Sequence, residues 1–200
     1  MLKCGITGAN GVLGKRLREL LPYKFFSFKK NIENFYQVSK WVNSQKFDLI
    51  LHLAAVVPTN KVKNNFEKAK SINVNGTKNI IKAVLNSKYP PKWFFYSSTS
   101  HVYPAIFKNK KFTEKINTSP SSKYGITKRS GELVVINSDI DGIVIRTSWL
   151  YSAYGNNFVK TMLKLGHERD ELEVVFDQVG TPTNASDLAK ACLDIINFSN

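Results

Sequence analysis

The sequence predicts an α/β protein built on a doubly wound parallel sheet. Short apolar runs, typical of buried strands, alternate with segments whose apolar residues recur at helical spacing. The chain has 200 residues, which is enough for one domain with a substantial core, whereas two full domains would be cramped. Alternation and length together favour one α/β unit, followed by the beginning of a second lobe.

The elements are expected in the order strand, helix, strand almost throughout. Pro22 ends the first helix because proline cannot continue a helical hydrogen-bond ladder, and Pro90 with Pro91 separates a later helix from its strand. Strands are expected at Leu2–Thr7, Tyr23–Phe28, Leu49–Leu53, Trp93–Tyr96, Ile143–Arg146 and Leu172–Phe176. Helices are expected at Gly11–Leu21, Phe35–Ser44, Phe66–Leu85, Tyr124–Ile136 and Phe158–Leu165 and from Asp187 onward, with a loop at Pro104–Ser122. The interval between Phe28 and Asp48 looks short for the strand count of the first half.

Composition indicates a globular protein without a membrane partner. Hydrophobic residues make up 42% of the chain, and the longest apolar runs, such as Leu49–Val57, are far too short to span a bilayer. We therefore expect a cytoplasmic location. Cys4 and Cys192 lie at opposite ends of the chain, so we expect reduced, inert thiols and no disulfide framework.

The formal charge of +14 raises the question of nucleic-acid binding. The excess comes from 24 Lys and only 5 Arg, whereas recognition of bases and phosphates relies on the fork of arginine. We interpret the charge as a solvated, lysine-rich surface and expect no nucleic-acid partner. The same charge still favours an anionic ligand, such as a phosphorylated cofactor or a nucleotide-linked sugar.

A glycine-rich loop, "TGANGVLGKRL", directly follows the first expected strand and directly precedes a helix. Gly8 permits the tight turn, Gly11 lets backbone amides approach a diphosphate, and Gly14 lets the helix pack close to the strand. The helix N-terminus then stabilises the anion. The loop in this setting predicts a Rossmann-type fold that binds a dinucleotide.

The residues after the second expected strand indicate which dinucleotide is bound. A site selective for NAD carries an acidic residue there, whereas this chain has Lys29 and Lys30. NADP(H) is therefore favoured over NAD(H). Lys15 and Arg16 could also reach an adenosine 2'-phosphate, and the alternative is that all four are solvated surface charges.

Tyr124 and Lys128 in "SSKYGITKRSGE" are four residues apart, so on a helix they share one face. An ammonium beside a phenol lowers the pKa of the phenol, which makes the pair a workable acid and base. Hydroxyl side chains lie at the end of the strand in "FFYSSTSHVYP", where parallel sheets bind their ligands. They could donate hydrogen bonds to a substrate carbonyl, or they could be ordinary polar residues at the end of a strand.

In this order, the segments "TGANGVLG", "LHLAAVVP", "INVNGTKNI", "YSSTSHVYP" and "YGITK" resemble the extended short-chain dehydrogenase/reductase family. The later segments "IRTSWLYSAYGNNFVKTMLKL" and "VVFDQVGTPTNASDLA" are similar to the dTDP-4-dehydrorhamnose reductases within it. The resemblance implies an NAD(P)-dependent sugar-nucleotide oxidoreductase that uses NADPH to reduce the 4-keto group of a nucleotide-linked 6-deoxy sugar. It also implies a Rossmann domain at residues 1–150 and, at residues 151–200, closing elements of the sheet with the start of an incomplete C-terminal substrate lobe.

The resemblance assigns roles to individual residues. Tyr124 would protonate the carbonyl oxygen, Lys128 would hold the nicotinamide ribose, and Thr99 would hydrogen-bond the substrate oxygen. Cofactor-binding residues would be Gly8, Asn10, Gly11, Val12, Leu13, Gly14, Lys29, Lys30, Leu53, Ala54, Ala55, Ser97, Ser98, Tyr124 and Lys128. Substrate residues would be Val57, Thr99, His101, Trp149 and Asn157, and no metal is expected.

The chain departs from the reductases at three places. It has Ser98, Thr99 and Ser100 where the reductases usually have Ser-Thr-Asp, the stretch after the second strand is abbreviated, and family members continue past the equivalent of Asn200. Two alternatives therefore stay open: a sugar-nucleotide epimerase or dehydratase with bound NAD, and a non-catalytic NAD(P)-binding regulatory protein. The residues do not decide between a monomer and a homodimer.

Overall fold

The computed structural model describes residues 1–57, 59–105, 111–176 and 178–198. The chain divides into two compact units. The first consists of residues 1–9 and 22–146, and the second consists of residues 10–21 and 147–200. These units reflect packing, and the functional division at residue 150 stays a prediction.

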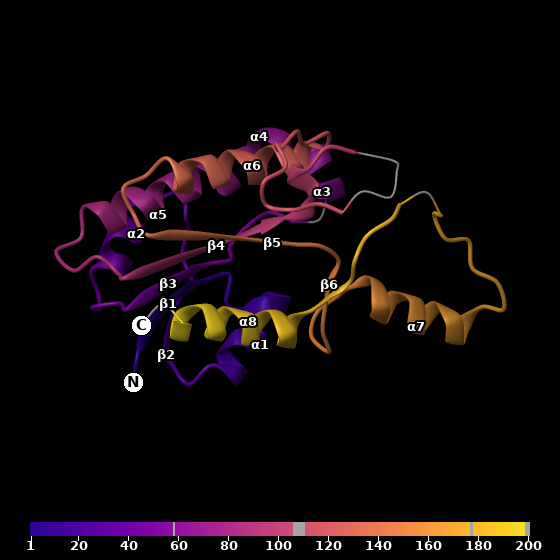
Figure 1. Ribbon diagram of the computed structural model, residues 1–200, viewed down its shortest axis with the longest axis horizontal. Coiled ribbons are helices and arrows are strands. Elements are labelled where there is room, and N and C mark those ends of the chain that lie inside the picture. Colours follow the sequence, from indigo (N-terminus) through magenta and orange to yellow (C-terminus); the bar gives the residue numbers. More distant parts are fainter. Residues whose placement is uncertain (58, 106–110, 177, 199–200) are drawn as a thin grey trace. The chain divides into compact units, whose positions relative to one another are not determined.

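A five-stranded sheet forms the centre of the first unit (Figure 1). Its strands, in the spatial order β2-β1-β3-β4-β5, are β1 (Lys3–Thr7), β2 (Lys24–Phe28), β3 (Leu49–His52), β4 (Trp93–Thr99) and β5 (Gly142–Thr147). The pairings β1–β2, β1–β3 and β3–β4 are parallel, and Thr7 lies opposite both Phe28 and His52. The carboxyl ends of neighbouring strands therefore meet at one edge of the sheet, and the expected parallel α/β fold is confirmed.

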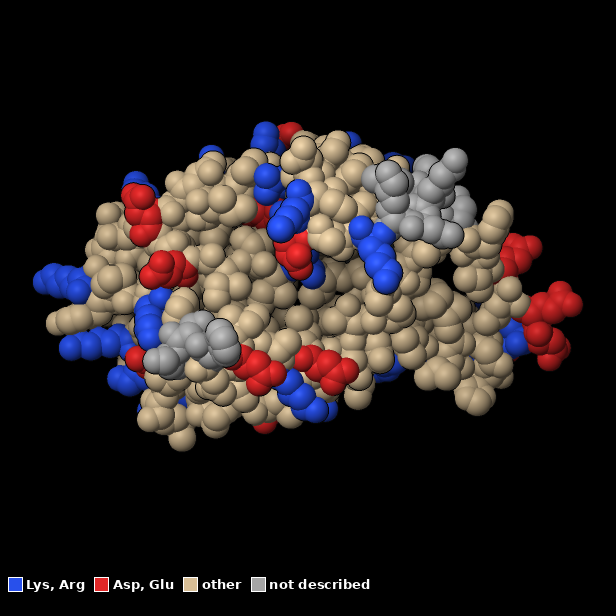
Figure 2. Space-filling view, viewed as in Figure 1, with Lys and Arg blue, Asp and Glu red and all other residues tan. Residues whose placement is uncertain are grey.

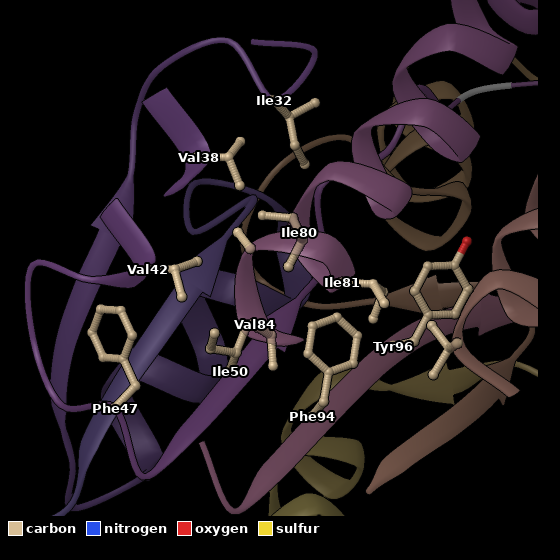
Figure 3. Close-up of a cluster of buried hydrophobic side chains, with 12 residues drawn as sticks. Ile32, Val38, Val42, Phe47, Ile50, Ile80, Ile81, Val84, Phe94 and Tyr96 are labelled. Carbon is tan, nitrogen blue, oxygen red and sulfur yellow. The ribbon is translucent and has the colours of Figure 1, made fainter. Parts of the chain in front are cut away.

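Helices of the first unit pack on one face of this sheet (Figure 1). They are α2 (Phe35–Val42), α3 (Thr59–Asn64), α4 (Phe66–Lys70), α5 (Gly76–Leu85) and α6 (Lys123–Ile136), with a short 3-10 turn, η2, at Ser100–Val102. Figure 3 shows the core between helices and sheet, where Val38 of α2 and Ile80 of α5 are fully buried. Burial of these side chains removes apolar surface from water and holds the helices on the sheet.

The helical segment expected at Phe66–Leu85 is not one regular helix. Between α4 and α5 the backbone forms a π-helical turn, η1 (Ser71–Asn75). Within it, the carbonyl of Asn73 accepts a hydrogen bond from the Thr77 hydroxyl at 2.7 Å. Such turns occur frequently at functional sites.

The second unit contains α1 (Val12–Leu20), β6 (Leu150–Tyr151), α7 (Phe158–Glu168), β7 (Thr183–Asn184) and α8 (Ala185–Phe198). β6 and β7 form a two-stranded parallel sheet, and α1 packs against α8. The Arg16 guanidinium on α1 donates hydrogen bonds to the Ser186 hydroxyl at 2.7 Å and to the Glu19 carboxylate at 2.8 Å. Among the described residues, no helix is long and apolar enough to cross a membrane.

Two expectations need correction. The strand expected at Leu172–Phe176 is wrong, since these residues have no regular structure and Phe176 is 94% exposed. The segment has the composition of a strand but pairs with no other strand. β4 continues to Thr99 instead of ending at Tyr96, so the hydroxyl residues belong to the strand. The expectation that the interval from Phe28 to Asp48 is too short for a further strand is confirmed, because the described residues between them form α2 and no strand, and β2 is an edge strand of the sheet. Within the expected loop Pro104–Ser122, residues 106–110 lie outside the described residues.

Candidate active site

Tyr124 lies in the first turn of α6, beside the end of β4. The Ser122 hydroxyl caps the helix by accepting a hydrogen bond from the Gly125 amide at 3.0 Å. A side-chain hydrogen bond joins Tyr124 to Thr99, the last residue of β4. The His101 ring meets the Tyr124 ring edge to face, with 5.7 Å between centroids. The structure therefore brings together three of the residues singled out in the sequence: Thr99, His101 and Tyr124.

The approach of α6 to the strand end depends on Gly125. A Cβ atom at this position would overlap the backbone carbonyl of His101 and would lie 3.0 Å from Pro120. No larger residue fits without a shift of the backbone on one side. The glycine that follows Tyr124 thus permits the contact between the start of the helix and η2.

Lys128 follows Tyr124 by one helical turn and is buried. Its Nζ lies 4.2 Å from the centroid of the Tyr96 ring. Burial lowers the pKa of Lys128 to about 7, although the nearby Glu132 carboxylate acts in the opposite direction. A lysine with this pKa is partly neutral at physiological pH.

The expected lowering of the Tyr124 pKa does not occur in this structure. Burial raises the pKa of Tyr124 to about 12, and the hydrogen bond from Thr99 only partly counters that effect. The expectation was wrong because burial penalises the phenolate and also the Lys128 ammonium that was meant to stabilise it. Tyr124 is therefore protonated at neutral pH, which is the form required of a proton donor.

A buried ion pair holds α6 one turn beyond Lys128, on the same face as Tyr124. Glu132 is fully buried, and its carboxylate accepts hydrogen bonds from the guanidinium groups of Arg146 and Arg129. Burial alone would raise the pKa of Glu132, but the hydrogen bonds from Arg146 and Arg129 lower it. Arg146 also donates to the Tyr103 hydroxyl at 3.1 Å. This ion pair anchors the helix that carries Tyr124 and Lys128.

The glycine turn begins where β1 ends. Gly8 has a φ of +70°, and a Cβ there would lie 2.7 Å from the Ala54 amide nitrogen. Only glycine adopts this conformation readily and leaves room for the backbone after β3. The amides of Leu53 and Ala54 donate to the Thr7 hydroxyl at 3.2 and 3.1 Å, which joins the two strand ends.

The segment that follows supplies the start of α1 in the second unit. The N-cap residue is Gly11, no side chain caps the helix, and the first turn holds no acidic residue. Amide groups in the first turn of a helix lack helical partners and attract anions. The start of this helix is therefore suited to bind an anion such as a diphosphate.

The basic residues expected near an adenosine 2'-phosphate differ in their surroundings. Lys29 and Lys30 are exposed and directly follow β2, the strand paired with β1. Lys15 is exposed, with its Nζ 5.5 Å from the centroid of the Tyr154 ring. Arg16 is already bound to Ser186 and Glu19. Lys29 and Lys30 are therefore the better candidates.

The remaining substrate candidates are distributed over both units. Val57 is 53% exposed and follows the loop after β3. Trp149 and Asn157 belong to the second unit, where Trp149 has a strained φ of 44°. Asn157 caps α7 by accepting from the Lys160 amide and donates to the Ser152 carbonyl. Both polar groups of its side chain thus have partners, and its role toward a substrate stays a prediction.

Reasoning from sequence missed two buried polar residues of this site. His52 ends β3 and Asn73 lies in η1, and both make several side-chain hydrogen bonds. Both residues stand in segments quoted for their resemblance, "LHLAAVVP" and "INVNGTKNI". Their partners are distant in sequence, so only the fold reveals them.

A parallel α/β sheet, a glycine turn after the first strand, and a helix that places Tyr124 against Thr99 and carries Lys128 one turn later are typical of the short-chain dehydrogenase/reductase class. Comparison with known proteins identifies the family. The model of the RmlD substrate binding domain matches residues 2–200, and the chain belongs to this family.

The chain is similar to a dTDP-4-dehydrorhamnose reductase of Aggregatibacter actinomycetemcomitans, with 33% identity over 98% of this chain and 67% of the relative. The crystal structure of a dTDP-4-dehydrorhamnose reductase from Clostridium acetobutylicum has a TM-score of 0.90 and 35% identity, and the match covers 98% of this chain and 70% of the reductase chain. The crystal structure of the Bacillus anthracis reductase in complex with NADP has a TM-score of 0.89 and 36% identity, and the match covers 98% of this chain and 71% of the reductase chain. The chain spans between 50% and 67% of the length of the first three curated relatives.

Proposed function

We propose that the chain acts as an NADPH-dependent reductase of the 4-keto group of a nucleotide-linked 6-deoxy sugar. The observation that carries the proposal is the placement of Tyr124, protonated and buried, against Thr99 at the carboxyl end of β4. The names of its relatives support the same reaction, since those at 33% and 36% identity are dTDP-4-dehydrorhamnose reductases. The proposed substrate is accordingly a dTDP-linked sugar.

NADP(H) is the proposed cofactor. The Bacillus anthracis relative was solved with NADP, and Lys29 and Lys30 offer positive charge for a 2'-phosphate. The residues proposed to hold the cofactor are those of the glycine segment Gly8–Gly14, the backbone of Ala54 and Ala55, and Lys128. When bound, the reduced nicotinamide supplies the hydride for the carbonyl carbon.

Thr99 and Tyr124 are the residues proposed to bind and protonate the substrate's carbonyl oxygen. Thr99 accepts a hydrogen bond from the His101 amide at 3.3 Å and so has a fixed hydroxyl position. We propose that, when substrate binds, this hydroxyl redirects its one hydrogen from the Tyr124 oxygen to the substrate oxygen, while Tyr124 transfers its phenolic proton to the alkoxide as it forms. Lys128 lies one turn further along the same helix. When Lys128 is protonated, its positive charge stabilises the Tyr124 phenolate that results.

Turnover of NADPH with a dTDP-4-keto-6-deoxy sugar, followed by absorbance, tests the proposal. Tyr124→Phe removes the proton donor and keeps the ring, so kcat should fall by roughly 10²–10⁴-fold while the Kd for NADPH changes little. Tyr36→Phe, at a residue 74% exposed on α2, is the matched control and should keep full activity.

The result that refutes the proposal is full activity in the Tyr124→Phe variant, or no turnover by the wild-type chain. NAD retained through purification, with no consumption of NADPH, would instead indicate an epimerase or dehydratase. Cofactor binding without turnover of any sugar nucleotide would indicate a regulatory protein.

The expected partners and location stay predictions. Figure 2 shows Lys and Arg side chains scattered over the visible face between acidic and uncharged residues, with no continuous basic surface among the described residues on that face. This supports the expectation that the charge of +14 reflects solvated lysines and not a nucleic-acid site. A homodimer and a cytoplasmic location are likewise proposals.

A further inference from the structure

His52 is a buried histidine that the proposed reaction does not use. It ends β3 at the edge of the sheet where ligands bind in parallel α/β folds, and it is 1% exposed. Its Nδ1 lies 2.8 Å from the Thr7 hydroxyl oxygen, and its Nε2 lies 2.9 Å from the Thr77 hydroxyl oxygen. Both ring nitrogens therefore have partners, one on β1 and one on α5.

The partners of the two threonines determine the tautomer. The Thr77 hydroxyl donates its hydrogen to the Asn73 carbonyl at 2.7 Å, so its oxygen can only accept from His52. The Thr7 oxygen already accepts from the amides of Leu53 and Ala54, so its hydrogen is directed at Nδ1. His52 must then carry its hydrogen on Nε2 and be neutral.

The hydrogen-bond chain continues to the catalytic helix. The Asn73 side chain accepts from the Val56 amide at 2.7 Å and donates to the Thr127 hydroxyl at 2.9 Å. Thr127 in turn donates to the Tyr124 carbonyl at 2.8 Å. A continuous polar path thus runs from residues 53–56 through η1 to the first turn of α6.

We propose that His52 is a positioning residue whose neutral Nε2–H tautomer fixes the backbone of residues 53–56, the loop after β3, relative to Tyr124. The consequence for catalysis rests on the proposed function, because residues 54 and 55 belong to the proposed cofactor site. The geometry of the chain itself does not depend on which reaction the protein catalyses.

Burial and charge around the ring agree with a permanently neutral histidine. The rings of Phe94 and Tyr96 lie beside the imidazole, with centroids at 6.0 and 5.6 Å. Burial, with a smaller contribution from the charge of Lys128, lowers the pKa of His52 to about 3. A protonated ring would also direct a second N–H at Thr7, whose oxygen already accepts two amides.

Long-range proton–nitrogen NMR of the imidazoles in the full chain tests the tautomer, with His52→Asn used to assign the signals. The expected pattern is that of an Nε2–H tautomer, unchanged as pH falls through the range near 6.5 in which an exposed histidine titrates. A pattern of the Nδ1–H tautomer, or titration in that range, overturns the proposal whatever the outcome of the activity assay.

Paired variants at Thr77 test the positioning role. Thr77→Val removes the hydroxyl and keeps the shape of the side chain. Thr77→Ser keeps the hydroxyl and should therefore behave as wild type. We expect Thr77→Val, and not Thr77→Ser, to shift the amide resonances of residues 53–56 and to raise the Kd for NADPH by about tenfold. Ile50→Val removes a buried methylene from β3, the strand that carries His52, and so controls for loss of packing. It should leave the amide resonances of residues 53–56 and the Kd for NADPH unchanged.

Equal amide shifts and equal NADPH affinity in the two Thr77 variants would overturn the positioning role. Failure of the proposed function gives a different result: the wild-type chain turns over no sugar nucleotide, while the tautomer and the shifts of residues 53–56 still behave as expected. A melting curve for each variant shows whether it is folded.

Discussion

The Glu132 carboxylate accepts a hydrogen bond on each oxygen from the Arg146 guanidinium, both at 2.8 Å. Glu132 lies on α6 one turn after Lys128, and Arg146 lies on β5, so the pair joins the helix of the candidate active site to the edge strand of the sheet. The Arg129 guanidinium adds a third contact at 2.9 Å. Such a fork-to-carboxylate geometry is directional as well as strong.

Removal of one partner should destabilise the fold severely. Arg146→Met leaves the buried Glu132 carboxylate without its main partner, which typically costs about 3–5 kcal/mol of unfolding free energy. Urea unfolding followed by circular dichroism measures the loss. Lys164→Met is the control, since its pair with Glu168 is exposed and 3.7 Å long and should contribute less than about 1 kcal/mol. Similar losses in the two variants would contradict the role of the buried pair.

The same carboxylate should contribute to acid unfolding. The pKa of Glu132 is lower in the folded chain than its ordinary value of 4.5, so the folded state binds fewer protons than the unfolded state at low pH. Its stabilising contribution is present above about pH 4.5 and is lost as pH falls through the folded pKa. Compared with wild type, Glu132→Gln should show a smaller dependence of unfolding free energy on pH below about 4.5. Identical slopes would argue against the pKa shift.

Gly125→Ala should impair catalysis by moving Tyr124. The added Cβ overlaps the His101 carbonyl, so the start of α6 or η2 must shift. We expect kcat to fall by about tenfold or more, because small displacements of a catalytic group slow the chemical step. Gly166→Ala on α7 is the matched control, as nothing lies within 4 Å of its new Cβ, and it should stabilise its helix without affecting kcat. Unchanged kcat in Gly125→Ala would show that the contact is dispensable.

The depressed pKa of Lys128 predicts how stability depends on alkaline pH. The pKa is about 7 in the folded chain and 10.5 for an ordinary lysine, so between these values the unfolded state binds more protons. The penalty for burying the charge is therefore present below about pH 7 and disappears as pH rises toward 10.5. The free energy of unfolding of wild type, relative to Lys128→Met, should increase over that window. A constant difference would show that Lys128 is charged in the folded chain.

Replacement of Lys29 and Lys30 should change the choice of cofactor. The double variant Lys29→Ala/Lys30→Ala removes the positive charge that directly follows β2, so the KM for NADPH should rise by about tenfold while the KM for NADH changes little. Lys88→Ala is the control, because this exposed lysine precedes the amino end of β4 at the opposite edge of the sheet. Equal effects on both cofactors would assign the 2'-phosphate to other residues.

Local sequence was sufficient for much of the fold. The glycine turn, the caps and the alternation of apolar runs act over a few neighbouring residues, so β1, α2 and α6 occur within a few residues of their expected bounds. The prediction of a strand at Leu172–Phe176 was wrong because strand formation is not a local property. Strand composition does not form a strand unless another strand pairs with it, and pairing depends on residues far away in the chain.

By itself, the sequence determined the order of the elements, the glycine turn at Gly8 and the spacing that places Tyr124 and Lys128 on one face of a helix. Only the tertiary structure decided the protonation of that pair, because pKa values depend on burial and on partners such as Thr99 and Glu132. It likewise decided the role of His52, whose partners lie 45 and 25 residues away. Hydrogen bonds between distant segments arise only once parallel strands align their ends, and no local pattern encodes them.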